Sequence, residues 1–115
     1  MLNSGVSWSI RQSYVITKVR ILFIDDEPHV LTAIGRLLRN DRARWEMVFA
    51  VGGERGLDEI RRQCFTVVVS DFRMPQVDGV AVLNEATATC PAVVPIMLSG
   101  DAEAGVVSRA VPALR

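Results

Sequence analysis

The sequence predicts an α/β fold, in which a parallel β-sheet is covered by helices on both faces. Two observations lead to this prediction. Short apolar runs with the composition of buried strands alternate along the chain with segments whose apolar residues recur at helical spacing. Pro and Gly residues stand where one element should end and the next begin. Strands that alternate with helices in this way form a parallel sheet with right-handed crossovers.

The first three elements are expected to be a strand, a helix and a second strand. Residues 19–24 form an apolar run that ends in two aspartates, which predicts a buried strand. Pro28 favours the first turn of a helix, and apolar residues then recur at helical spacing as far as Asn40. Residues 45–51 predict the second strand, which a pair of glycines brings to an end.

The remaining elements continue the alternation. A short amphipathic helix, marked by Leu57 and Ile60, ends near Gln63. The β-branched residues within 65–70 predict a buried central strand, and Pro91 stops the helix that follows it. The later elements are expected at 80–88 (helix), 93–98 (strand) and 102–110 (helix).

Length and composition indicate one small domain with an apolar core. The chain has 115 residues, of which 50% are hydrophobic and 23% charged, and its formal net charge is zero. This balance argues against direct binding to nucleic acid, and no apolar run reaches the roughly 18 residues of a membrane span. Residues 1–18 are polar, lack a secretory signal and are expected to be a flexible extension of a domain at 19–115. A cytoplasmic location is therefore expected.

Two cysteines, Cys64 and Cys90, lie far apart in the sequence. They show no C-x-x-C spacing and no neighbouring histidine cluster, so neither a metal site nor a redox motif is expected. The sequence therefore predicts free thiols, either buried or at the surface.

Polar side chains follow three of the predicted strands directly. Asp25 and Asp26 end the first strand, Asp71 ends the third, and Ser99 ends the fourth. Because such sheets place their sites at the carboxyl ends of the strands, these side chains are expected to converge. Two carboxylates about 4 Å apart repel each other by about 4 kcal/mol at an effective dielectric constant near 20. Such a cluster either takes up protons or holds a cation.

Carboxylate oxygens favour Mg²⁺, which keeps several waters and usually also binds a phosphate oxygen. An aspartate beside such an ion is suited to accept a phosphoryl group, because the ion offsets the charge of both the nucleophile and the incoming group. The pattern therefore predicts Mg²⁺-dependent phosphoryl transfer to an aspartate.

Three segments resemble the receiver domains of two-component response regulators. Residues 21–28 (ILFIDDEP) resemble their opening, and residues 95–100 (PIMLSG) resemble their fourth strand and switch hydroxyl. Residues 67–79 (VVVSDFRMPQVDG) match every fixed position of their phosphoacceptor segment, D-x-x-M-P-x-x-D-G. The resemblance extends from about Val19 to the C-terminus. It implies a flavodoxin-like doubly wound sheet with the strand order 2-1-3-4.

The resemblance also implies roles for individual residues. Asp71 would be the phosphoacceptor, supplied by a histidine kinase or a phosphotransfer protein. Asp26 would bind Mg²⁺ directly, Asp25 would act mainly through a metal-bound water, and Asp71 and the backbone carbonyl of Arg73 would complete the protein ligands. Ser99 would donate a hydrogen bond to the phosphoryl group and act as the switch hydroxyl. The domain would not be an enzyme beyond its own phosphorylation and dephosphorylation.

The chain departs from the family at its C-terminal end. Receiver domains finish with a fifth strand and a fifth helix, and that strand supplies a lysine to the phosphorylation site. The sequence has no lysine after Lys18, so we expect a truncated receiver that lacks its fifth strand, its fifth helix and its output domain. Phosphorylation is expected to be impaired, and the exposed edge of the fourth strand is expected to favour a homodimer.

Two other functions are open to such a chain. One is a degenerate receiver that serves only as a protein-interaction or dimerisation module. The other is a Mg²⁺-dependent phosphohydrolase, but its D-x-D-x-T motif is missing because Arg73 stands where the second acid is needed.

Several of these residues also have a purely structural role open to them. Asp25 and Asp26 could cap the helix that follows them, and Ser99 could cap the fourth helix. Asp78 and Gly79 are expected to form a turn rather than take part in chemistry. Solvated structural positions are expected for Glu27 in the first helical turn, for His29, and for Arg36, Arg39, Arg42 and Arg44.

Overall fold

The computed structural model describes residues 18–98 of the chain. The predicted N-terminal extension, Ser99 and the predicted helix at 102–110 lie outside these residues, apart from Lys18. The described elements are β1 (Val19–Asp25), α2 (Pro28–Leu37), the short 3-10 helix η1 (Arg39–Asp41), β2 (Trp45–Val51), α3 (Gly53–Arg62), β3 (Val67–Asp71), α4 (Gly79–Thr89) and β4 (Val94–Leu98).

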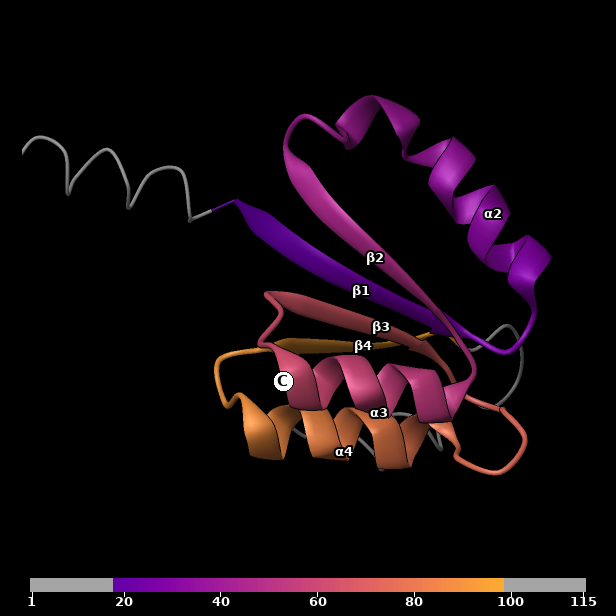
Figure 1. Cartoon of the computed structure of the whole chain (residues 1–115), viewed down its shortest axis with the longest axis vertical. Coiled ribbons are helices and arrows are strands. Elements are labelled where there is room, and N and C mark those ends of the chain that lie inside the picture. The colour runs from indigo at the N-terminus through magenta and orange to yellow at the C-terminus, as the bar shows by residue number, and fades with distance from the viewer. Residues whose placement is uncertain (1–17, 99–115) are drawn as a thin grey trace, which may run out of the picture.

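The four described strands form one parallel sheet in the order β2-β1-β3-β4. In Figure 1, α3 and α4 lie side by side on one face of this sheet, and α2 lies on the other face. The predicted doubly wound α/β fold and its strand order are therefore confirmed. Between residues 18 and 98, no helix has both the length and the apolar character that crossing a membrane requires.

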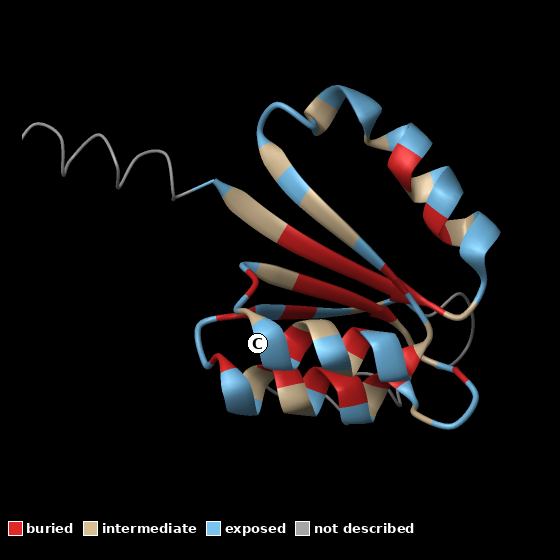
Figure 2. Cartoon of the chain, viewed as in Figure 1, coloured by how far each residue is buried: buried red, intermediate tan, exposed pale blue. Residues whose placement is uncertain are grey.

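The core has two layers because helices cover both faces of the central strands. In β1, Leu22 and Ile24 pack toward α3 and α4, whereas Ile21 and Phe23 pack toward Leu31 of α2. Successive residues of a strand point to opposite faces, so a strand buried on both sides is apolar throughout. Figure 2 shows this as a continuous buried stretch along the carboxyl half of β1.

Element boundaries differ from the predictions by a few residues. The first helix ends at Leu37 instead of Asn40, and the chain continues as the 3-10 helix η1. The third strand begins at Val67, two residues later than expected. Phe65 is buried in the core, and the Thr66 side chain accepts a hydrogen bond from the Arg20 amide at 3.0 Å. In the sequence, a buried residue just before a strand is therefore difficult to distinguish from a residue of the strand.

The prediction of free thiols is wrong, because Cys64 and Cys90 form a disulfide. Cys64 follows the end of α3, and Cys90 caps the end of α4. These two helices lie side by side and end at the same end of the sheet (Figure 1), which brings the two Cα atoms to 5.9 Å. That separation lies within the usual disulfide range of about 4.4–6.8 Å. The helix arrangement creates the pair, so no local spacing motif indicates it.

Reduction of the Cys64–Cys90 disulfide is expected to lower the free energy of unfolding by about 3 kcal/mol, because the bond joins residues 26 positions apart and restricts the unfolded chain. Urea unfolding followed by circular dichroism, with and without dithiothreitol, measures the difference. A variant with both cysteines changed to Ser should not respond to the reductant. Equal midpoints for the oxidised and reduced wild-type chain would contradict the prediction.

Candidate functional site

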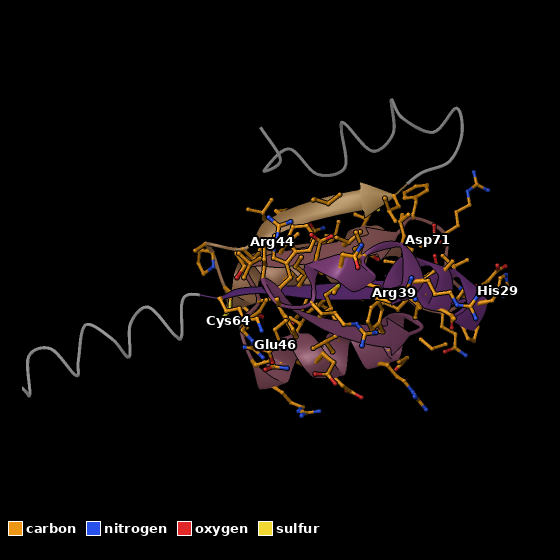
Figure 3. All side chains as sticks on the ribbon, turned by 90° about the horizontal axis from the view of Figure 1, so that it is seen from above. His29, Arg39, Arg44, Glu46, Cys64 and Asp71 are labelled. Carbon is orange, nitrogen blue, oxygen red and sulfur yellow. A yellow bond between two sulfur atoms is a disulfide. The ribbon has the colours of Figure 1, made fainter. Side chains whose placement is uncertain are left out.

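Three aspartates meet at the carboxyl edge of the sheet. Each of Asp25, Asp26 and Asp71 offers a carboxylate oxygen, and these oxygens all lie within 4.8 Å of one another. β1 and β3 are neighbouring parallel strands whose register pairs Ile24 with Ser70. The residues that follow this pair, Asp25 and Asp71, therefore end their strands side by side. Figure 3 shows Asp71 at this end of the sheet.

Backbone amides hold two of the carboxylates in place. Asp25 Oδ1 accepts a hydrogen bond from the amide of Glu27 at 2.9 Å, and Asp71 Oδ1 accepts one from the amide of Phe72 at 2.9 Å. The helix α2 begins after Glu27, which occupies its N-cap without a side-chain cap bond. The prediction that Glu27 is a first-turn acid is therefore wrong, because Glu27 precedes the first turn. Asp25 binds the loop before the helix rather than an amide within it.

Burial and repulsion from neighbouring acids disfavour the charged forms of Asp25 and Asp71. The pKa of Asp25 is raised, first by burial and then by the charges of Asp26 and Glu27, although the Glu27 amide opposes this. The pKa of Asp71 is also raised, first by burial and then by the charge of Asp25, against the effect of the Phe72 amide. A bound cation would favour the ionised forms that these surroundings oppose.

The loop after β3 is held against Asp71 by a close backbone contact. A Cβ atom at Gly79 would lie 2.1 Å from the backbone oxygen of Asp71, so only glycine fits there. The Gly79 amide donates to the oxygen of Phe72 at 2.9 Å. Asp78 caps α4 by accepting a hydrogen bond from the Ala81 amide at 2.9 Å. Asp78 and Gly79 therefore have a structural role, as helix cap and close contact rather than as a simple turn.

The other predicted site residues have different outcomes. Arg73 lies in the loop two residues after Asp71 and is exposed, and the metal-binding role of its carbonyl stays a prediction. Ser99 lies outside the part of the chain that the structure describes. Lys18, immediately before β1, lies at the end of that strand remote from Asp25. His29 is exposed, as predicted, and its Nε2 lies 3.2 Å from Oε1 of Glu27.

The comparison with protein families agrees with the motifs. Residues 21–113 match the model of a family described as the response regulator receiver domain. The chain belongs to this family. The receiver domain is similar to the transcriptional regulatory protein ZraR of Escherichia coli K12, with 34% identity over 80 residues. This match covers 70% of the receiver domain but only 18% of ZraR.

Solved structures show the same fold. A response regulator receiver domain protein from Clostridium thermocellum is 30% identical, with a TM-score of 0.74 over 83% of this chain and 75% of that chain. The receiver domain of the sensor histidine kinase PA1611 from Pseudomonas aeruginosa, which holds a magnesium ion in its active-site cleft, is 25% identical with a TM-score of 0.68. That match covers 83% of this chain and 78% of the other.

Replacing Asp71 with Asn is expected to stabilise the metal-free receiver domain at neutral pH by on the order of 1 kcal/mol, because one of three clustered charges is removed. The folded state raises the pKa of Asp71, so it binds more protons than the unfolded state, and the cost of the cluster grows as the pH rises. The gain should therefore shrink as the pH falls toward about 3.9, the ordinary pKa of an aspartate.

Thermal unfolding in the presence of a chelator, repeated across this pH range, measures the gain. Asp58→Asn provides a matched control, since Asp58 lies on α3 outside the cluster, and this substitution should change little. A loss of stability in Asp71→Asn at neutral pH would contradict the repulsion argument.

Proposed function

We propose that this receiver domain accepts a phosphoryl group on Asp71 from a histidine kinase or a phosphotransfer protein, and then changes its interactions with a partner or output domain. The single observation that carries the proposal is the cluster of Asp25, Asp26 and Asp71 at the carboxyl edge of the sheet. Family membership supports it, as does the complete D-x-x-M-P-x-x-D-G segment that follows β3. The proposal includes a cytoplasmic location, where such phosphodonors act.

The donor set fits a Mg²⁺ ion. Three carboxylates offer hard oxygen ligands within 4.8 Å of one another, and Asp25, Asp26, Asp71 and the carbonyl of Arg73 would hold the ion. When bound, Mg²⁺ would supply positive charge that offsets the charge of Asp71 and of an incoming phosphoryl group. The magnesium ion in the similar Pseudomonas receiver domain supports this assignment.

Asp71 is positioned to act as the nucleophile. The Phe72 amide holds its Oδ1, so the second oxygen is the one to attack the phosphorus. The bond from phosphorus to the imidazole nitrogen of a phosphohistidine breaks, and that nitrogen keeps the electron pair. An acyl phosphate forms on Asp71. Partial burial keeps bulk water away from the nucleophile, and the contact of Gly79 with the Asp71 backbone restricts its movement.

The proposed switch residue follows the end of β4. Asp71 pairs with Leu98 in the register of β3 and β4, and Ser99 is the next residue in the sequence. This register supports a role for the Ser99 hydroxyl in donating a hydrogen bond to the phosphoryl group and in reporting its presence.

A degenerate receiver is the second candidate, because residues 19–115 offer no lysine to the aspartates. The sequence has no lysine after Lys18, and Lys18 lies at the far end of β1 from the aspartates. A degenerate receiver would act only as a protein-interaction module. A degenerate receiver should not bind Mg²⁺ at the aspartates, and adding beryllofluoride should not change the spectrum of the protein. A competent receiver should bind Mg²⁺ and should show a spectral change with beryllofluoride.

The 115-residue chain is expected to be labelled on Asp71 by acetyl phosphate with Mg²⁺, on the order of a hundredfold more slowly than a receiver domain that has the lysine, because one preorganised charge is missing. Intact-mass spectrometry at successive times measures the rate. Chelation of Mg²⁺ or the substitution Asp71→Asn should abolish labelling, and Asp58→Asn should leave it unchanged.

Labelling at the rate of a complete receiver would show that the lysine is not needed. Labelling that persists in Asp71→Asn would place the phosphoryl group elsewhere. A chain that binds no Mg²⁺, ignores beryllofluoride and takes no label would be the degenerate module.

We also propose a homodimer through β4. This strand is at the edge of the described sheet, and its exposed face carries Val94, Ile96 and Leu98, which are between 39% and 48% accessible. An apolar strand at a sheet edge favours pairing with an identical strand.

Light scattering across a range of concentrations is expected to show a dimer that Ile96→Lys converts to a monomer, since a lysine on an edge strand opposes pairing. Leu37→Lys is the control, because Leu37 is an exposed apolar residue of α2, away from β4. A monomer at every concentration, or equal loss of the dimer in both variants, would contradict the proposal.

A further inference from the structure

The disulfide lies at the end of the sheet opposite the aspartate cluster. Cys64 precedes β3, whereas Asp71 is the last residue of that strand, and Figure 3 shows the two residues at opposite ends. The bond therefore takes no part in the phosphorylation chemistry. Disulfides are rare in reducing compartments, and those found there usually act as transient or redox-sensing bonds. A disulfide in a domain of this family is thus a candidate site of thiol chemistry.

The two cysteines differ in their access to solvent. Cys64 is exposed, whereas Cys90 is 9% accessible and belongs to the core cluster that includes Ile60, Phe65 and Val93. Cys64 is therefore the more accessible of the two residues, and Cys90 is sheltered by the core. In thiol–disulfide exchange, access decides which sulfur is attacked. The structure thus assigns Cys64 as the attacked sulfur and Cys90 as the leaving and resolving sulfur.

Both cysteines line a surface hollow that also carries basic side chains. The hollow is lined by Lys18, Arg20, Cys64, Phe65, Thr66, Thr89, Cys90, Pro91, Ala92 and Val93. The guanidinium of Arg20 is fixed beside the disulfide, because it donates to the backbone oxygen of Cys64 at 3.1 Å and stacks over the ring of Phe65.

Within residues 18–98, two acidic side chains near Arg20 or on α3 are already paired with arginines. Glu46 pairs with Arg20 at 3.3 Å, and Glu59 pairs with Arg62 on α3. Lys18 forms no ion pair with any residue from 19 to 98. The hollow therefore favours a small molecule with a negative charge over a neutral one.

We propose that the Cys64–Cys90 pair is a thiol–disulfide exchange site that reacts with small anionic thiols and their disulfides. The thiolate of the small molecule attacks Sγ of Cys64, the bond to Cys90 breaks, and Cys90 leaves as a thiolate that takes up a proton. A second small thiolate then attacks the small-molecule sulfur of the mixed disulfide and releases Cys64. Two small thiols are oxidised to one disulfide, and the protein gains two electrons and two protons.

Oxidation follows the same path in reverse. The Cys64 thiolate attacks a small anionic disulfide, and one small thiol leaves as the mixed disulfide forms. The Cys90 thiolate then attacks Sγ of Cys64, the bond to the small molecule breaks, and the second small thiol leaves as the protein disulfide closes. This site is separate from Asp71, so its test does not depend on the proposed phosphorylation.

The full 115-residue chain, first reduced, is treated with glutathione disulfide, quenched with N-ethylmaleimide and analysed by intact-mass spectrometry. Cys90→Ser should accumulate a mixed disulfide on Cys64, and Cys64→Ser should be modified at least about tenfold more slowly, because the remaining thiol is buried. Wild type should pass through the mixed disulfide to the closed bond, and excess reduced glutathione should reopen it. Circular dichroism verifies that each variant is folded.

The charge of the hollow is tested with a neutral probe. Each rate of modification is first divided by the rate for a cysteine-containing peptide. On this scale, glutathione disulfide should modify Cys64 about fivefold faster than 2-hydroxyethyl disulfide does. The substitution Lys18→Gln should remove most of this preference. High salt should have the same effect.

Three outcomes would overturn the proposal. The first is a wild-type disulfide that excess glutathione cannot open in the folded state, which would be a structural bond only. The second is equal modification of the two single-cysteine variants. The third is the absence of any preference for the anionic disulfide. If Cys90→Ser does not fold, early quenching of the wild type decides the matter, since the first mixed disulfide must lie on Cys64.

Discussion

Repulsion among three carboxylates at one edge of the sheet is the constraint on which the rest of this structure depends. The parallel register of β1 and β3 sets Asp25 and Asp71 side by side, and Asp26 adds a third charge. Burial makes the ionised forms of Asp25 and Asp71 more costly still. A sheet covered on both faces resists spreading of the strands, because any movement would expose the two core layers beneath the helices. The fold thus maintains a local charge density that a divalent cation would relieve.

One helix connects the two chemically distinct ends of the domain. At its start, α4 touches the end of β3, where Gly79 lies against the backbone of Asp71. At its end, Cys90 caps the helix and forms the disulfide with Cys64. Between these points, Val82, Leu83 and Ala86 are buried in the core. The helix is therefore tied by backbone contact at one end and by a covalent bond at the other, with apolar packing along its length.

Sequence reasoning worked best where a local pattern has one physical meaning. The apolar runs could only be buried strands once helices separated them, and the aspartates after them had to meet at the carboxyl edge of a parallel sheet. It worked less well at element ends, because burial and strand pairing are different properties. Phe65 is buried without belonging to β3. The α-helix ends at Leu37, although Leu38 continues its apolar spacing. It failed for the cysteines, whose pairing depends on two helices that lie side by side.

The amino-acid sequence by itself determined the α/β class, the strand order that the family implies, and the candidate phosphoacceptor. The features that did so are the alternation of strands and helices, the acids after the strands, and the segment from Asp71 to Gly79. These features are local, so the order of residues along the chain contains them. Only the tertiary structure decided that Gly79 must lack a side chain against Asp71 and that Cys64 reaches Cys90. Each of these depends on the distance between segments that packing brings together, and no single segment of sequence specifies such a distance.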